Sequence, residues 1–242
     1  MLMNKIQIKD LSVDFNDNKI LENITFNFQS SQSLCVIGRG SEGKTTLLKS
    51  VVGLIKIKTG QIYLNNENLN TQFKKKKFFD SFGVLFQKDA LFDSLRVWEN
   101  IIFKNLNSNF NEHDLKQKAF KLLKVVDLDI SVGDLYPAEL SGGMKKRVGI
   151  ARAISDEPKF LILDEPTAGL DPVKTNKILQ IISDLSRKKK VAILAVSSDI
   201  KSVLKYFDNV MVIHNKKKRW FGKTSEIRKS NLKIVKDLLK YT

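Results

Sequence analysis

A glycine-rich segment with the residue types of a phosphate-binding loop follows the apolar run 34–37. It reads Gly38-Arg39-Gly40-Ser41-Glu42-Gly43-Lys44-Thr45-Thr46. This fits the pattern G-x-x-x-x-G-K-[ST], whose glycines let successive backbone N–H groups point at one anion in front of the next helix. We expect Lys44 to reach the β- and γ-phosphates of a nucleotide and the Thr45 hydroxyl to bind Mg²⁺. A glycine-rich turn without a ligand is the alternative, and the apolar strand and helix on either side of the segment count against it.

Two carboxylates, Asp164 and Glu165, follow the apolar run 160–163. In a doubly wound sheet, ligands collect at the carboxyl ends of the strands, where the loops after different strands face one another. We therefore expect Asp164 to hold Mg²⁺, usually through water, and Glu165 to lie beside the γ-phosphate. A carboxylate there can orient and deprotonate an attacking water, whereas an amide could only orient it. An Asp-Glu pair is weak evidence alone, and the phosphate loop upstream makes it strong.

A second candidate anion site lies in the element Leu140-Ser141-Gly142-Gly143-Met144. The next helix carries three cations in its first turn, Lys145, Lys146 and Arg147. They oppose the helix dipole, yet they make the helix N-terminus a better seat for a phosphate. A simple N-cap role for Ser141 is the alternative. Two such helix starts in one chain indicate that the loop of one subunit binds ATP and the helix of another subunit closes on it.

The apolar residues follow two different patterns. Short alternating segments predict half-exposed antiparallel strands, and they are carried by Ile6, Ile8 and Leu11, by Ile24, Phe26 and Phe28, and by Ile62 and Leu64. Continuous apolar runs at 34–37, 160–163, 191–196 and 210–213 predict strands covered on both faces, as in a parallel sheet. Helical patterns separate these runs, for example around Leu47, Val148 and Ile181. This alternation predicts an α/β fold with right-handed crossovers.

The order of the motifs resembles that of the nucleotide-binding subunit of ATP-binding-cassette (ABC) transporters, over essentially the whole chain. The motifs are the phosphate loop, Gln87, the Leu-Ser-Gly-Gly-Met element, the pair Asp164-Glu165 and the segment Ala168-Gly169-Leu170-Asp171. The resemblance implies two cassettes, head to tail, that sandwich two ATP molecules and are driven together by binding. It further implies that hydrolysis separates them and that the motion passes to a membrane permease. The partner is then a second copy of the chain or a homologous cassette.

The resemblance also implies roles for single residues. Gln87 would touch Mg²⁺ and link to the permease, and Asp171 would signal between the subunits. Ser141, Gly142 and Gly143 would contact the ATP held by the opposite copy. Phe15 matches the aromatic residue that stacks on adenine in this family, and a core phenylalanine is its alternative.

The implied architecture is a single nucleotide-binding domain over residues 1–242. Its fold class is α/β, with a P-loop NTPase core built on a mainly parallel sheet, an N-terminal antiparallel β subdomain and a helical subdomain. The stretch from about 88 to 140 has helical periodicity and no fully apolar strand, so we expect a helical insert there. The helical subdomain as a whole is expected at about 88–155.

A narrower resemblance points to the Mla-type phospholipid-trafficking ATPases of Gram-negative envelopes. It is carried by the segments 86–95 and 136–147. Ala90, Leu91 and Phe92 would suit the groove that receives a permease coupling helix, or they could be core filling. Asp89 stands where relatives often have glycine, and relatives commonly extend further at the C-terminus. Substrate-binding or accessory subunits are further possible partners.

The chain departs from the family at the switch histidine. Ser198 stands at the expected position, in Ala195-Val196-Ser197-Ser198-Asp199, and neither His113 nor His214 fits it. A serine hydroxyl can donate one hydrogen bond to the γ-phosphate but cannot carry a positive charge. We therefore expect hydrolysis that is slow, or that depends on Glu165 and a water at Ser198.

The composition excludes several classes of protein. With 242 residues and 42% hydrophobic content the chain can bury a core, and its single cysteine, Cys35, excludes an internal disulfide and is expected in a buried strand. The longest apolar run, 191–196, is far shorter than the roughly 20 residues of a membrane-spanning helix, and the N-terminus lacks the apolar core of a secretory signal. We expect a cytoplasmic protein that is peripheral on the cytoplasmic face of the inner membrane.

The net charge of +16 points to a polyanionic partner, such as nucleic acid, a nucleotide or an acidic membrane surface. No basic run is interleaved with aromatic residues as in a base-stacking surface, and no nucleic acid is expected as a partner. Basic residues that face acidic headgroups would suit any transporter.

Three alternative functions share parts of the pattern. A chromosome-maintenance or DNA-repair ATPase usually separates its two ATP motifs by a long coiled coil or a zinc insert, whereas about a hundred residues separate Gly38 from Ser141 here. A cassette without a permease, acting in translation or regulation, normally has two cassettes in one chain. The third alternative keeps the transporter and changes its cargo to an amino acid, a metal chelate or a drug.

Overall fold

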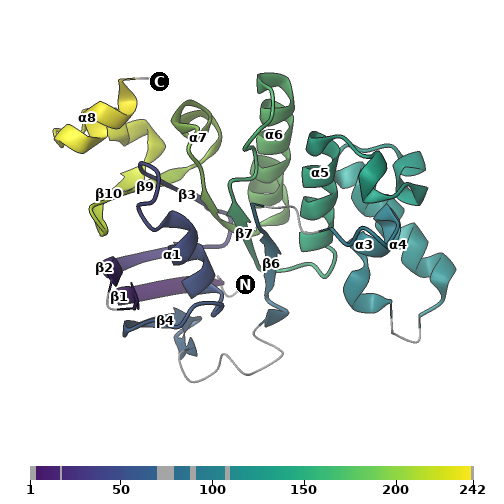
Figure 1. Ribbon diagram of the computed structural model, residues 1–242, viewed down its shortest axis with the longest axis horizontal. Helices are drawn as coiled ribbons and strands as arrows, with labels where there is room; N and C mark the ends of the chain where they lie inside the picture. Colours follow the sequence, from purple (N-terminus) through teal and green to yellow (C-terminus); the bar gives the residue numbers. More distant parts are fainter. Residues whose placement is uncertain (1–3, 17, 70–78, 88–90, 107–109, 241–242) are drawn as a thin grey trace.

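The computed structural model describes residues 4–16, 18–69, 79–87, 91–106 and 110–240, which form two sheets and a set of helices (Figure 1). The first sheet is antiparallel and contains, in spatial order, β2 (Asn18–Gln29), β1 (Lys5–Phe15), β4 (Thr59–Leu64) and β5 (Glu67–Asn68). The second contains, in spatial order, β10 (Lys217–Lys223), β9 (Asn209–His214), β3 (Ser33–Ile37), β8 (Ala192–Val196), β7 (Phe160–Asp164) and β6 (Phe82–Leu85). The strands from β9 to β6 are parallel to one another, and β10 is antiparallel to β9.

Helices connect most of the parallel strands, and a further helix follows β10 at the C-terminal end. The α-helices are α1 (Lys44–Val51), α3 (Val97–Ile101), α4 (Glu112–Val125), α5 (Gly142–Ala153), α6 (Pro172–Lys189), α7 (Ile200–Tyr206) and α8 (Lys233–Leu239). The short 3-10 helices are η2 (Phe103–Asn105), η3 (Ile130–Asp134), η4 (Pro137–Glu139) and η5 (Thr224–Lys229). Among the described residues, no helix combines the length and the apolar character needed to cross a bilayer.

Burial follows the two apolar patterns of the sequence. In β2, Ile24, Phe26 and Phe28 are buried while Thr25 and Asn27 are exposed, as expected for a strand with one solvated face. Every residue of β3, β7 and β8 is buried, because these central strands are covered on both faces. The predicted antiparallel and parallel strands are therefore confirmed, whereas the antiparallel edge strand β10 was not predicted.

The six-stranded sheet separates two hydrophobic cores. Alternate residues of β3 point to opposite cores: Leu34 and Val36 pack with β1, β2 and α1, and Cys35 and Ile37 pack with the helical side. Cys35 is fully buried there, as expected, and burial raises the pKa of its thiol well above the ordinary value. The central strands thus contribute side chains to a separate core on each face of the sheet.

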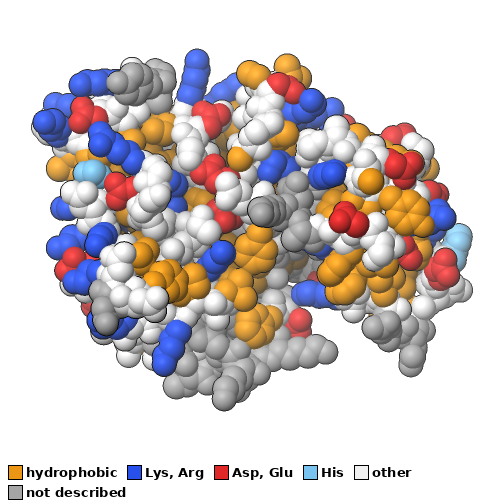
Figure 2. Space-filling model, in the orientation of Figure 1, with side chains coloured by type: hydrophobic (Ala, Val, Ile, Leu, Met, Phe, Trp, Pro, Cys, Tyr) orange, Lys and Arg blue, Asp and Glu red, His pale blue; other side chains and the backbone are white. Residues whose placement is uncertain are grey.

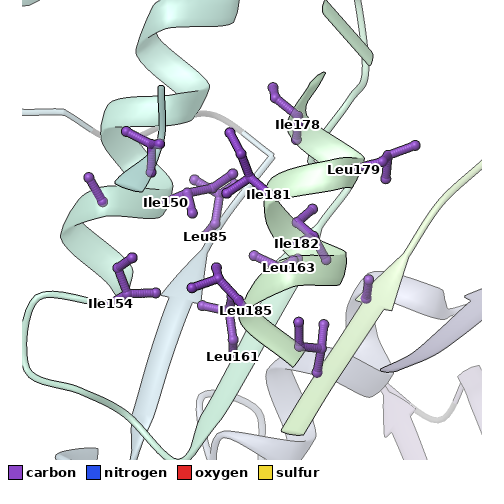
Figure 3. Close-up of a cluster of buried hydrophobic side chains, with 14 of the residues drawn as sticks. Leu85, Ile150, Ile154, Leu161, Leu163, Ile178, Leu179, Ile181, Ile182 and Leu185 are labelled. Atoms are coloured by element: carbon purple, nitrogen blue, oxygen red, sulfur yellow. The ribbon is translucent and has the colours of Figure 1, made fainter. Parts of the chain in front are cut away.

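The helical side is held together where α5 and α6 meet the sheet. Figure 3 shows side chains of these two helices gathered over side chains of β6 and β7. The helices contribute Ile150, Ile154, Ile178, Ile181, Ile182 and Leu185, and the strands contribute Leu85, Leu161 and Leu163. The spacing of Ile178, Ile181, Ile182 and Leu185 places them on one face of α6. The packing fixes the helical group to the edge of the parallel sheet.

The regular elements described between β6 and β7 are all helices, from α3 to α5, and they are joined by turns. This agrees with the helical periodicity of residues 88–140. An antiparallel sheet, a mainly parallel sheet and a helical group together match the predicted fold class.

Candidate functional site

The carboxyl ends of four parallel strands meet at one edge of the sheet. Val36 of β3 and Asp164 of β7 both pair with Val196 of β8, and Leu85 of β6 pairs with Leu163. The first residues of the loops continue this order, because the N–H of Ser197 donates to the carbonyl of Val36 (3.2 Å) and the N–H of Glu165 donates to the carbonyl of Val196 (3.2 Å). The loops that follow β3, β7 and β8 therefore converge at this edge, as predicted for the phosphate loop and the Asp164-Glu165 pair.

The phosphate loop is folded tightly between β9 and β2. A Cβ atom on Gly38 would lie 2.5 Å from the carbonyl oxygen of Ile213, and one on Gly43 would lie 2.9 Å from Cδ2 of Leu21. Gly43 also has a φ of 84°, in the left-handed region that favours glycine. These two glycines are required for the close approach of the loop to its neighbours, whereas a Cβ on Gly40 would meet nothing within 4 Å.

Lys44 begins helix α1 and its ammonium group is held over the loop. Its Nζ donates to the carbonyl oxygens of Gly38 (3.0 Å) and Arg39 (2.8 Å), and the residue is only 8% exposed. An anion that enters the loop therefore meets a positive charge already in place, together with the N-terminal N–H groups of α1.

Thr45 and Asp164 form the oxygen-rich part of the site. The Thr45 hydroxyl donates to Oδ1 of Asp164 at 2.9 Å, and Asp164 is 4% exposed. Burial raises the pKa of Asp164, and the hydrogen bond from Thr45 acts in the opposite direction. A buried carboxylate beside a hydroxyl is a donor set that suits Mg²⁺, which prefers oxygen ligands and commonly takes one or two carboxylates plus substrate phosphates.

Glu165 and Ser198, the two predicted catalytic residues, are in direct contact. The Ser198 hydroxyl donates to Oε1 of Glu165 at 2.6 Å, and the Ser198 N–H donates to Oε2 at 3.1 Å. Glu165 has a φ of 49°, which a non-glycine residue adopts only when its surroundings enforce it. Both carboxylate oxygens are therefore held in one orientation at the sheet edge.

A cavity of about 390 Å³ lies beside this pair. It is lined by Arg39, Ser198, Asp199, Ile200, Lys201, Asp237 and Leu238. The first two connect the phosphate loop with the position of the switch residue, as expected. The last two come from α8 and were not predicted, because nothing in the local sequence shows that the C-terminal helix returns to the site.

Ser141 and Asp171 both begin helices. The Ser141 hydroxyl accepts a hydrogen bond from the N–H of Met144 (3.3 Å), and Asp171 accepts one from the N–H of Lys174 (2.9 Å). These bonds are N-caps, the structural alternative given for Ser141. The contacts with Lys174 also lower the pKa of Asp171.

The two caps lie together and away from the phosphate loop of the same chain. A Cβ on Gly143 would lie 3.0 Å from Cδ of Lys174, so the start of α5 packs against the start of α6. A Cβ on Gly142 would meet nothing within 4 Å. Figure 1 places α5 on the opposite side of β6 and β7 from α1. Within one chain, the Ser141 element therefore does not complete the site around Lys44.

Phe15 and Gln87 are both exposed. Phe15 is 45% exposed at the end of β1, opposite Asn18, the first residue of β2, so the alternative of a core phenylalanine is wrong. Leu85, the last residue of β6, pairs with Leu163 of β7. Gln87 lies two residues after Leu85, and Glu165 lies two residues after Leu163. This register places Gln87 on the strand end next to that of Glu165.

An apolar groove of about 440 Å³ lies between the strand β6 and the inserted helices. Its lining includes Leu54, Phe79, Phe86, Phe92 and Phe103, and the rings of Phe92 and Phe103 stack at 4.3 Å. Figure 2 shows hydrophobic side chains exposed at β6 and over α3. Phe92 lines this groove and Leu91 packs against the core, whereas Asp89 and Ala90 lie outside the described residues.

Comparison with known proteins gives a consistent family. The model of the family described as ABC transporter matches residues 21–168, more than half of the chain. The chain is 30% identical over 224 residues to the methionine import ATP-binding protein MetN of Clostridium tetani, covering 92% of this chain and 70% of that protein. It is 33% identical over 200 residues to the energy-coupling factor transporter ATP-binding protein EcfA2 of Acetivibrio thermocellus, covering 82% of this chain and 70% of that protein.

A solved structure shares both the fold and the sequence pattern. The structure of cbiO1 from Clostridium perfringens, described as part of the ABC transporter complex cbiONQ, superposes with a TM-score of 0.83 at 29% identity over 96% of both chains. These relatives are named for methionine import, an energy-coupling factor and cbiONQ, so they give no support to the narrower Mla-type resemblance. Its motifs and its folded core together show that this chain is an ATP-binding ATPase cassette of the ABC transporter family.

Proposed function

We propose that this chain is the ATP-hydrolysing subunit of a membrane transporter. The observation that carries the proposal is the convergence of three pairs at one sheet edge: Lys44 with its loop carbonyls, Thr45 with Asp164, and Ser198 with Glu165. The whole chain, residues 1–242, acts as one nucleotide-binding domain with a helical subdomain at about 88–155. It works as a peripheral protein on the cytoplasmic face of the inner membrane.

The residues at this edge of the parallel sheet have different roles in phosphoryl transfer. Lys44 and the loop amides from Gly38 to Thr46 bind the phosphates, and Phe15 stacks on the adenine. Thr45, Asp164 and Gln87 would hold Mg²⁺, which would neutralise negative charge on the phosphates. Glu165 accepts the proton of the attacking water, and Ser198 keeps both of its oxygens in place.

Ser198 gives a prediction about turnover. Ser198→Ala removes the hydroxyl that orients Glu165 and is expected to lower kcat by about tenfold, while Ser198→His restores a group that can carry positive charge and is expected to raise kcat above that of the parent. Steady-state phosphate release from the purified protein measures both. Ser202→Ala on α7 is the control, because only the backbone N–H of Ser202 takes part in its bond to Asp199. An unchanged or lower rate in Ser198→His would count against slow hydrolysis at this position.

Completion of the site by a second cassette follows from the position of Ser141. Because α5 starts far from the phosphate loop of its own chain, Ser141, Gly142 and Gly143 are free of that loop and reach the ATP of a second copy or of a homologous cassette. Asp171, which caps α6 beside them, lies at the same junction and signals between the two sites.

The apolar groove is the docking site of the permease. It adjoins Phe86, directly before Gln87, so an element seated there touches the loop that joins the groove to the nucleotide site. Phe92→Asp places a charge in the groove and is expected to reduce co-purification with the membrane partner by about tenfold or more. The control is Phe110→Asp, since Phe110 is 65% exposed and does not line the groove. Equal recovery of both variants with detergent-solubilised membranes would contradict this docking site.

Two cargo classes are supported by different observations. The segments 86–95 and 136–147 resemble Mla-type ATPases and favour a phospholipid or another lipid as cargo. The names of the relatives favour a small solute such as methionine, and the support for the two classes is about equal. Purification of the protein with its membrane partner, followed by identification of the bound molecule by mass spectrometry, separates them. A bound phospholipid supports the first class, and a bound amino acid or other solute the second.

A further inference from the structure

The phosphate loop contains a carboxylate, although its ligand is a polyanion. Glu42 stands directly before Gly43, the N-cap residue of α1, where the backbone N–H groups and the helix dipole attract negative charge. A carboxylate attached to the loop itself is present at high effective concentration near these groups. If its side chain were free to turn, it would compete with a nucleotide phosphate for the same amides.

The structure shows Glu42 held elsewhere, by the last residue of β9. Oε1 of Glu42 lies 2.7 Å from Nδ1 of His214, and the two side chains are only 12% and 24% exposed. In both the neutral Nδ1–H tautomer and the imidazolium, the ring can donate this hydrogen bond to the carboxylate. The carboxylate therefore points to the end of β9.

The contact is built into the packing of the loop against β9. The carbonyl of Ile213, the residue before His214, lies 2.5 Å from where a Cβ on Gly38 would be, and Cβ of Glu42 lies 3.7 Å from that same position. Only a glycine at position 38 allows β9 to come this close. The end of β9 is thus near enough for its histidine to reach across the loop to Glu42.

His214 is itself fixed by the turn between β9 and β10. Nε of Arg219 donates to the carbonyl of His214 (3.0 Å). Lys217, the first residue of β10, pairs with Glu22 of β2 (3.6 Å), and the N–H of Glu22 donates to the carbonyl of Lys216 in the turn (2.8 Å). The imidazole is therefore presented from an anchored backbone, which makes it a fixed point for the Glu42 carboxylate.

We propose that His214 is a positioning residue for ATP binding, which tethers the Glu42 carboxylate away from the phosphate loop's amides so that they stay available to the nucleotide. This rests on the proposed nucleotide binding by the loop. It gives a role to a histidine that does not fit the family's switch position, and it explains how this loop tolerates an acidic residue.

The test measures the Kd of Mg²⁺-ATP by calorimetry, together with KM and kcat, on the full chain. His214→Ala releases Glu42 and is expected to raise Kd and KM by about tenfold, with kcat at saturating ATP within about twofold of the parent. Glu42→Gln alone should bind ATP at least as tightly as the parent. The double variant Glu42→Gln with His214→Ala should return Kd to within about twofold of the parent, because the competing carboxylate is gone.

The controls separate this role from a structural one. His113→Ala alters the other histidine, which is exposed in the first turn of α4, and should leave Kd unchanged. Circular dichroism melting confirms that each variant is folded, and if His214→Ala does not fold, His214→Leu keeps more of the volume and carries the same expectations. If the contact were only a structural staple, the double variant would bind ATP as weakly as His214→Ala.

Two results would overturn the proposal while leaving the proposed function intact: a parent-like Kd in a folded His214→Ala or His214→Leu variant, or no recovery in the double variant. A parent protein that shows no Mg²⁺-dependent affinity for ATP would overturn the proposed function itself, and this proposal with it. The parent measurement therefore comes first.

Discussion

Glu165→Gln is expected to lower the rate of ATP hydrolysis by about 10²–10⁴-fold, the range typical for loss of a general base. The amide keeps the size of the side chain and can still accept a hydrogen bond from the Ser198 N–H, which lies 3.1 Å from Oε2 of Glu165. It cannot take a proton from water at neutral pH. The Kd of Mg²⁺-ATP, measured on the same preparation, should therefore stay within a few fold of the parent.

A matched carboxylate at the other end of β7 provides the control. Glu157 is exposed in the loop that leads into this strand, so Glu157→Gln makes the same chemical change away from the site. Its phosphate release should equal that of the parent. If Glu165→Gln released phosphate at the parental rate, Glu165 would not be the base, and the catalytic assignment would be wrong.

Lys44→Ala is expected to lower kcat/KM by a comparably large factor, because it weakens the binding of the ATP phosphates. The ammonium group is already held over the loop by two carbonyl oxygens, at 3.0 and 2.8 Å, so it requires little rearrangement to meet a phosphate. Removal of one such preorganised charge is expected to reduce kcat/KM by about 10²–10³-fold, with a higher Kd for ATP. Calorimetric titration with Mg²⁺-ATP and phosphate release give the two quantities.

The control for this change is Lys56→Ala, since Lys56 is an exposed lysine beyond the end of α1. It also tests whether the effect of Lys44→Ala reflects the overall charge of +16 instead of the position of one ammonium group. Equal loss of ATP affinity in both variants would show that binding is a diffuse electrostatic effect and that the loop is not the site.

Much of the fold could be predicted because the apolar patterns differ in kind. Alternation in β2 and continuity in β3 reflect one solvated face and two covered faces, and each pattern leads to one kind of sheet. The edge strand β10 was missed because its residues, 217–223, are mostly charged or aromatic and its partner β9 supplies the hydrogen bonds. Pairing of this kind is a tertiary property that a local pattern does not contain.

The site could be predicted as far as motifs specify backbone geometry. The phosphate loop and the Asp164-Glu165 pair were located because strand ends determine where their side chains converge. The contact between Ser198 and Glu165, the tether between Glu42 and His214 and the return of α8 to Arg39 each join segments far apart in the sequence. Only the packed fold brings these segments together, so spacing alone could not reveal them.

Leu91 and Phe92 show that the sequence does not distinguish a core position from a groove position. Apolar residues after Gln87 fit a docking groove and a core equally well in the sequence, because both environments exclude water. In the structure, Leu91 joins the core and Phe92 is 42% exposed in the groove. Two neighbouring apolar residues thus lie in different environments, which their residue types alone could not reveal.

The central claim is that the phosphate loop of one molecule is completed by the Ser141 turn of another when ATP is bound. Light scattering on the Glu165→Gln variant, with and without Mg²⁺-ATP, tests it most directly, because slow hydrolysis preserves the closed state. The account predicts a mass near the 27.6 kDa of one chain without nucleotide and about twice that value with it. A variant that binds ATP at its loop and keeps the mass of a single chain would contradict it.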